Sequence, residues 1–131
     1  MMDMMERTNK RVLVVAHDRE LRDMLSIQLI SAGYTVYGAE NGLEALEQME
    51  KHPVDLVLTD YQMPWMDGIE FLSLSRLRWP GTPVVILSGK QGDLAHEQAV
   101  EEGAFAWVRK GCESMTLLEV VAMVIPHSAH V

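Results

Sequence analysis

Cysteine and positive charge are both scarce in this sequence. Its one cysteine, Cys112, cannot form an internal disulfide, and this fits a reducing cytoplasm. Eleven lysine and arginine residues against 19 aspartate and glutamate residues give a formal net charge of -8. Because such a charge repels phosphate backbones and anionic lipid, we expect no direct binding to nucleic acid or to membranes. The composition therefore favours a soluble, cytoplasmic protein.

Long apolar runs, internal repeats and linker-like segments are also absent. No run approaches the ~20 apolar residues that span a bilayer, and the charged start of the chain lacks the apolar region of a signal peptide. A chain of 131 residues, 48% of them hydrophobic, suits one compact domain. We expect that domain over residues 10–125, with tails at 1–9 and 126–131.

What the sequence does contain is a regular alternation of strand and helix patterns. Apolar, β-branched segments without polar alternation predict strands that are covered on both faces. They read RVLVVA, PVDLVLT, PVVIL and AFAWV, and YTVYG predicts one shorter strand. Because helical patterns separate the strands, the sheet should be parallel, with right-handed crossovers. The prediction is a flavodoxin-like, doubly wound α/β fold: a five-stranded parallel sheet in the order 2-1-3-4-5, with helices on both faces.

Polar residues at characteristic offsets indicate where the predicted helices begin. Asp18 can cap the first helix. Asn41 with Glu44, and Asp67 with Glu70, have the three-residue offset of a capping box, in which each side chain accepts a hydrogen bond from the other residue's backbone N–H. Each pair should therefore open a helix.

Three predicted strands end on polar side chains. Asp60 ends the third strand, Ser88 the fourth and Lys110 the fifth, each directly after apolar residues. In the predicted strand order these ends are neighbours, at the edge of the sheet where doubly wound folds bind their ligands. A carboxylate nucleophile, a hydroxyl donor and an ammonium group together suit the acceptance of a phosphoryl group.

These residues resemble the receiver domain of two-component response regulators, and in particular the receivers of chemotaxis. It rests on the segment DYQMPWMDG from Asp60 to Gly68, the strand VVILSG, the turn EEGA and the segment VRK that ends on Lys110, and it covers most of the chain. It implies that a histidine kinase or phosphotransfer protein phosphorylates Asp60 and that a conformational switch relays the signal. It implies no enzyme activity beyond self-phosphorylation and self-dephosphorylation.

The same resemblance assigns a switch. Ser88 would move toward the phosphoryl group, and the aromatic side chain of Trp107 would turn inward behind it. A static Trp107, packed on the sheet edge, is the alternative. Gln62 and Lys90 stand at the positions that tune the lifetime of the phosphoryl group in the family.

The sequence departs from the family pattern after the first strand. Receivers carry two acidic residues there, and one of them holds Mg²⁺, but Ala16 and His17 stand at these positions. The oxygen donors that remain are Asp60, the backbone carbonyl of Gln62 and, through water, Asp18. We therefore expect Mg²⁺ to bind weakly or not at all.

His17 leaves three roles open. It can pair with Asp60, it can serve as an imidazole ligand of a borderline metal, or it can simply fill the loop. A further departure is Gly111, which follows Lys110 where the family typically has proline and which loosens that loop.

Other functions compete with a phosphorylated receiver. The missing acidic pair favours a degenerate receiver that serves as a phosphorylation-independent protein-interaction module. A haloacid-dehalogenase-like phosphatase would require an acidic residue where Gln62 stands. A flavin carrier or a dinucleotide enzyme would require a phosphate-binding loop of another composition than HDRELR.

The last predicted helix indicates a docking face. One stripe of the helix should face the sheet; its members are Ser114, Leu117, Leu118, Val121 and Ile125. Met123 lies nearly opposite this stripe and Val120 lies well off it, so both should be exposed. We therefore expect the last two helices and the last strand to contact an output domain or a second copy of the chain. The alternative is that the C-terminal tail covers part of the last helix.

Overall fold

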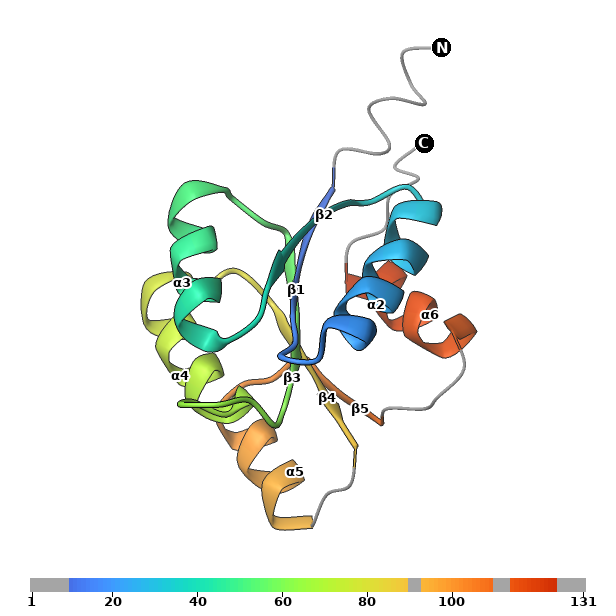
Figure 1. Ribbon diagram of the computed structural model, residues 1–131. Helices are drawn as coiled ribbons and strands as arrows, with labels where there is room; N and C mark the ends of the chain where they lie inside the picture. Colours follow the sequence, from blue (N-terminus) through green and yellow to red (C-terminus); the bar gives the residue numbers. More distant parts are fainter. Residues whose placement is uncertain (1–9, 90–92, 110–113, 125–131) are drawn as a thin grey trace.

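A single parallel sheet forms the centre of the molecule (Figure 1). The computed structural model describes residues 10–89, 93–109 and 114–124, apart from the side chains of residues 93–96, 109 and 114–116. The strands are β1 (Arg11–Val15), β2 (Thr35–Ala39), β3 (Leu56–Asp60), β4 (Val84–Ser88) and β5 (Ala106–Arg109), in the order β2-β1-β3-β4-β5. The predicted flavodoxin-like architecture is thereby confirmed.

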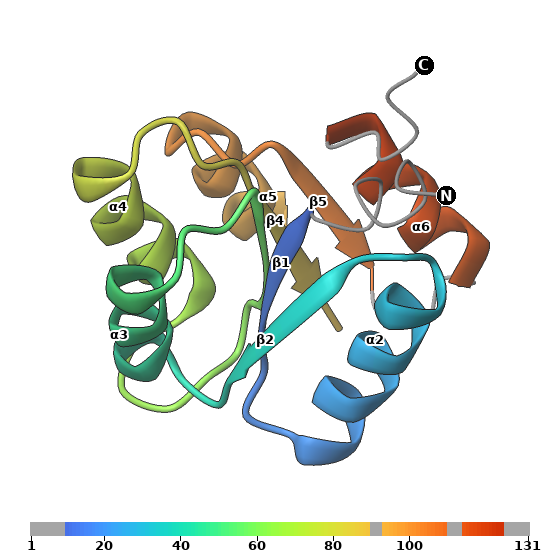
Figure 2. The ribbon, with the colours of Figure 1, turned by 90° about the horizontal axis from the view of Figure 1, so that it is seen from above.

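Helices cover both faces of this sheet. They are α2 (Arg19–Ser31), α3 (Gly42–Lys51), α4 (Gly68–Arg78), α5 (Asp93–Glu101) and α6 (Ser114–Val124). Figure 2, which views the molecule from above, shows α2 and α6 on one face and α3, α4 and α5 on the other. None of the helices in the described ranges is long and apolar enough to cross a membrane.

The alternation of side chains along each strand divides the core into two layers. Val12 and Val14 of β1 pack with α2 and α6, whereas Leu13 and Val15 pack with the helices of the opposite face. Both layers need apolar residues, so β1, β3 and β4 have continuous apolar runs rather than alternating ones. β3 begins at Leu56, three residues later than the predicted segment, which starts with a proline that has no N–H for the ladder.

The capping residues begin their helices as the spacing predicts, with one correction. Asp67 and Glu70 form a complete capping box at the start of α4. Asn41 accepts a hydrogen bond from the Glu44 N–H, but the Glu44 carboxylate accepts from the Glu40 N–H at 2.6 Å rather than from Asn41 itself. The second hydrogen bond of the predicted box therefore forms at the N–H of Glu40, one residue before Asn41.

The exposed face of α6 differs in part from the prediction. Leu117 and Val121 are buried and Leu118 is partly buried, as the stripe requires, and Met123 is exposed. Val120, however, packs against the core layer that α6 shares with α2, so its predicted exposure is wrong. A neighbouring helix covers positions that lie off the stripe of a single helix, and α2 lies beside α6 here. The side chain of Ser114 and residue Ile125 lie outside the described part of the structure.

Candidate functional site

Asp60 is a buried carboxylate at the carboxyl edge of the sheet. It is the last residue of β3, pairs with Leu87 of β4 in register and is 4% exposed. Charged side chains are seldom buried to this extent unless they have partners or a function. The strand therefore holds a potential nucleophile at a fixed place on the floor of the site.

The loop that follows Asp60 closes back on it. The Tyr61 N–H donates to the Leu87 carbonyl at 2.8 Å, and the Gly68 N–H donates to the Tyr61 carbonyl at 2.7 Å. A Cβ atom added to Gly68 would lie 2.7 Å from the Asp60 carbonyl oxygen, so only glycine permits this approach. The glycine of the MDG segment thus joins the start of α4 to the end of β3.

The structure brings Ser88 to the strand end beside Asp60. Ser88 ends β4, the neighbour of β3, and is 0% exposed. Lys110, the third member of the predicted site, follows directly after β5 in the sequence but lies outside the described residues, as do Lys90, Gly111 and Cys112. The described part of the site therefore consists of a carboxylate and a hydroxyl on adjacent strands.

Trp107 of β5 makes an aromatic contact that the sequence did not reveal. Its ring centroid lies 5.6 Å from that of Tyr61, with an interplanar angle of 52°. Both residues are partly buried and pack against the core layer beneath α3, α4 and α5. The residue next to Asp60 is thus in direct contact with the proposed switch residue, whereas movement of Trp107 stays a prediction.

At the end of β1 the side chains differ in kind from those at the end of β3. Val15 pairs with Thr59, so Ala16 follows β1 at the level at which Asp60 ends β3. Ala16 is fully buried and presents a methyl group. His17 is exposed, and its pairing with Asp60 or with a metal stays a prediction.

An arginine side chain contacts the backbone at these two positions. The Arg22 guanidinium donates to the Ala16 carbonyl at 2.7 Å and, at 3.4 Å, to the His17 carbonyl. These backbone oxygens therefore face a cation of the chain itself. No sequence pattern predicts this contact, because it depends on how α2 turns back over the end of β1.

Asp18 and Gln62 complete the predicted oxygen donors. The Asp18 carboxylate accepts a hydrogen bond from the Glu20 N–H at 3.0 Å and caps α2. Gln62 is exposed at the start of the loop after Asp60. Across the described ranges, no group of three or more His, Cys, Asp and Glu residues is placed to hold a metal ion. Mg²⁺ is usually held through one or two carboxylates together with waters, and the described strand ends β1 and β3 offer one carboxylate, that of Asp60.

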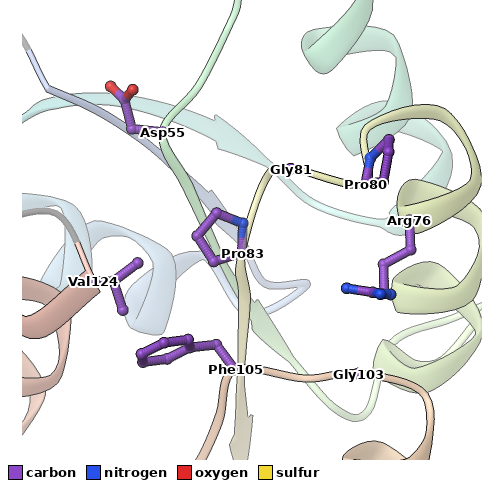
Figure 3. Close-up of a pocket in the computed structure, with 8 residues that line it drawn as sticks. All are labelled: Asp55, Arg76, Pro80, Gly81, Pro83, Gly103, Phe105 and Val124. Carbon is purple, nitrogen blue, oxygen red and sulfur yellow. The ribbon is translucent and has the colours of Figure 1, made fainter.

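A hollow of about 470 Å³ lies at the opposite edge of the sheet (Figure 3). Its lining residues come from the segments that precede β3, β4 and β5 and from the ends of α4 and α6; they are Asp55, Arg76, Pro80, Gly81, Pro83, Gly103, Phe105 and Val124. Neither Asp60 nor Ser88 contributes to it. The hollow is therefore separate from the candidate site.

The chain is similar to known proteins over most of its length. The family model described as the response regulator receiver domain matches residues 12–122. The DNA-binding transcriptional regulator NtrC of Escherichia coli is 34% identical over 116 residues, covering 88% of this chain and 25% of that protein. The transcriptional regulatory protein GlrR of Escherichia coli is 31% identical over 118 residues, covering 90% of this chain and 27% of that protein.

A solved structure extends the similarity to three dimensions. The chemotaxis protein CheY4 of Vibrio cholerae matches with a TM-score of 0.84 and 31% sequence identity, covering 88% of this chain and 98% of that one. The curated relatives are longer proteins, and this chain spans about a quarter of the length of NtrC and GlrR.

Proposed function

Because the chain belongs to the response regulator receiver domain family, we propose that Asp60 accepts a phosphoryl group from a histidine kinase or phosphotransfer protein. The observation that carries this proposal is the buried Asp60 carboxylate at the end of β3, beside the buried Ser88 at the end of β4. A carboxylate oxygen attacks phosphorus while the bond from phosphorus to the donor histidine nitrogen breaks, and the imidazole keeps that electron pair.

Three further residues would support the transfer and its relay. The Ser88 hydroxyl donates to a phosphoryl oxygen, and the Lys110 ammonium neutralises the charge that develops. Tyr61 follows Asp60 and contacts Trp107, so a conformational change at the phosphorylated end of β3 would be transmitted to β5. The chain carries out no catalysis on other substrates in this proposal.

We infer that Mg²⁺ binds weakly to this receiver. Receiver domains bind Mg²⁺ at an acidic pocket, but here Ala16 contributes a methyl group and Asp18 caps α2. The Ala16 and His17 carbonyls also face the Arg22 guanidinium, and a cation there opposes the approach of another. Phosphorylation should therefore be slow.

A second function is favoured by the same positions. A receiver without the acidic pair can serve as a protein-interaction module that does not respond to phosphate. The buried Ala16 supports this alternative, whereas the buried Asp60, which such a module would not need, supports phosphorylation.

In both the phosphorylated receiver and the interaction module, the docking face would consist of α5, β5 and α6. Val100, Phe105 and Met123 lie exposed on or between these elements. Exposed apolar side chains on neighbouring elements suit contact with an output domain or a second copy of the chain. With its acidic composition and single cysteine, such a signalling domain fits the cytoplasm.

Intact-mass measurement after incubation with acetyl phosphate tests the proposal. The unaltered chain should gain the mass of one phosphoryl group, and Asp60→Asn should gain none. Continued labelling of Asp60→Asn would refute the assignment of Asp60. An unaltered chain that stays unlabelled, with and without Mg²⁺, would favour the interaction module.

A further inference from the structure

Trp65 combines a strained backbone with an exposed side chain. Its φ angle is 72°, and within the described ranges it is the single non-glycine residue with a positive φ. This left-handed region brings Cβ close to the backbone carbonyl, so bulky residues seldom adopt it. The Trp65 side chain is 79% exposed and therefore recovers little of this cost by burial. The fold by itself therefore gains little from tryptophan at this position.

The loop that carries Trp65 is held at both ends and in the middle. The hydrogen bond between Gly68 and Tyr61 closes it, and the Met66 N–H donates to the Pro64 carbonyl at 2.8 Å. The Met66 side chain packs closely over Gly42, at the start of α3. Trp65 therefore projects from an ordered loop rather than from a free chain end.

The surroundings of Trp65 on this loop are apolar. Its neighbours in the sequence are Met63, Pro64 and Met66, and the carboxylate of Asp67 already accepts hydrogen bonds from the first turn of α4. Interface centres are rich in tryptophan and methionine and poor in charge, and tryptophan is enriched among the residues that dominate binding energy. The loop has the composition of a protein-binding surface.

The position of the loop indicates what it contacts. Asp60 is 4% exposed, and the loop begins directly after it and returns to its carbonyl oxygen. A protein that brings a phosphohistidine to Asp60 has to meet the rim of this crevice, so the surface around Trp65 is continuous with the contact that phosphoryl transfer requires.

We propose that Trp65 is an anchor for the protein that donates the phosphoryl group to Asp60, and that its backbone strain is retained for this contact. This inference rests on the function proposed above. Trp65 acts as a positioning residue: it inserts into an apolar surface of the donor and sets the place of the donor histidine relative to Asp60.

Two substitutions separate this role from a structural one. Trp65→Asn removes the aromatic side chain and introduces a residue that tolerates positive φ. Leu77→Gln is the matched control, because Leu77 is also exposed, at 80%, but lies in the last turn of α4. Leu77 stands nine positions after Gly68 in α4, a rise of about 13 Å along the helix axis from the end that adjoins Asp60.

The donor probe is a histidine-containing phosphotransfer domain, chosen from a set as the one that binds the unaltered chain most tightly by calorimetry. Trp65→Asn should raise its Kd at least tenfold and Leu77→Gln less than twofold. Labelling by acetyl phosphate, which needs no protein contact, should stay within about twofold in both variants. The thermal midpoint of Trp65→Asn should rise by about 2–4 °C as the strain is relieved.

Each other outcome is informative. An unchanged Kd for Trp65→Asn would overturn the anchor, as would the absence of binding by every domain of the set. A lower thermal midpoint would overturn the claim that backbone strain is retained for this contact. A dimer that sediments as a monomer after Trp65→Asn would assign the surface to a second copy instead. If acetyl phosphate fails to label Asp60 but Trp65→Asn still raises the Kd tenfold, the proposed function would fail and Trp65 would anchor a partner that transfers no phosphoryl group.

Discussion

The ends of β1 and β3 lie side by side at one edge of the sheet, yet their chemistry is opposite. β3 ends on a buried carboxylate, Asp60, and β1 leads at the same level to a buried methyl group, Ala16. Both strands are largely buried and contribute residues to both core layers. The fold therefore does not require the acidic pair, and the nucleophile and the metal-holding residues of a receiver can change independently.

The largest effect, on the rate of Asp60 phosphorylation, is expected when the end of β1 is given carboxylates like the one at the end of β3. Ala16→Asp combined with His17→Asp should increase the rate of Asp60 phosphorylation by acetyl phosphate at least tenfold when Mg²⁺ is present. The added carboxylates supply hard oxygen ligands and negative charge that offsets dehydration of the ion. The rate is followed by intact mass. Equal rates in the double variant and the unaltered chain would show that the end of β1 does not limit the reaction.

The junction between β3 and α4 should be intolerant of a methyl group. Gly68→Ala places a Cβ 2.7 Å from the Asp60 carbonyl oxygen and 3.0 Å from the Tyr61 Cα, both backbone atoms. We expect a loss of about 2 kcal/mol in the free energy of unfolding, measured by urea denaturation.

Gly81→Ala is the control for this substitution. Nothing lies within 4 Å of a Cβ atom added at Gly81. Its stability should change by less than about 0.5 kcal/mol. If both alanine variants were equally stable, the close approach of α4 to Asp60 would not matter for folding.

Asp18 should contribute to stability through α2 rather than through a metal. Asp18→Ala removes the cap that accepts from Glu20 and should cost about 1 kcal/mol, whereas Asp18→Asn keeps a capping oxygen and should cost little. Both values follow from thermal or urea unfolding without Mg²⁺. A stable Asp18→Asn variant that binds Mg²⁺ more weakly than the unaltered chain would instead identify Asp18 as a ligand.

The smallest effect on stability is expected at the docking face. Met123 is 73% exposed, so Met123→Glu should change the free energy of unfolding by less than about 0.5 kcal/mol. If α6 mediates self-association, the variant should sediment as a monomer at concentrations at which the unaltered chain forms dimers. A chain that is monomeric at high concentration, with or without this substitution, would exclude a homodimer through this face.

The strands and the floor of the site could be predicted from the sequence because their signals are local. Continuous apolar runs indicate buried parallel strands, and a polar residue at the end of such a run indicates the carboxyl edge, as for Asp60 and Ser88. Features that depend on neighbouring elements were not predictable. The contact of Arg22 with Ala16, the tilted contact of Tyr61 with Trp107 and the partial burial of Val120 all arise from how separate segments pack.

The positive φ angle of Trp65 could not be predicted from the sequence for a different reason. A positive φ is usually indicated by glycine or asparagine, and a tryptophan gives no such signal. Such a departure of local preference from the adopted conformation is expected where function rather than stability selects the residue.

Titration with Mg²⁺ tests most directly the claim that this receiver keeps its nucleophile without its metal-holding pair. Tryptophan fluorescence reports binding, because Trp65 lies on the loop that follows Asp60. The unaltered chain should bind Mg²⁺ at least tenfold more weakly than the variant that combines Ala16→Asp with His17→Asp. Equal affinity in the two proteins would contradict the account and would show that other residues, Asp18 first among them, hold the ion.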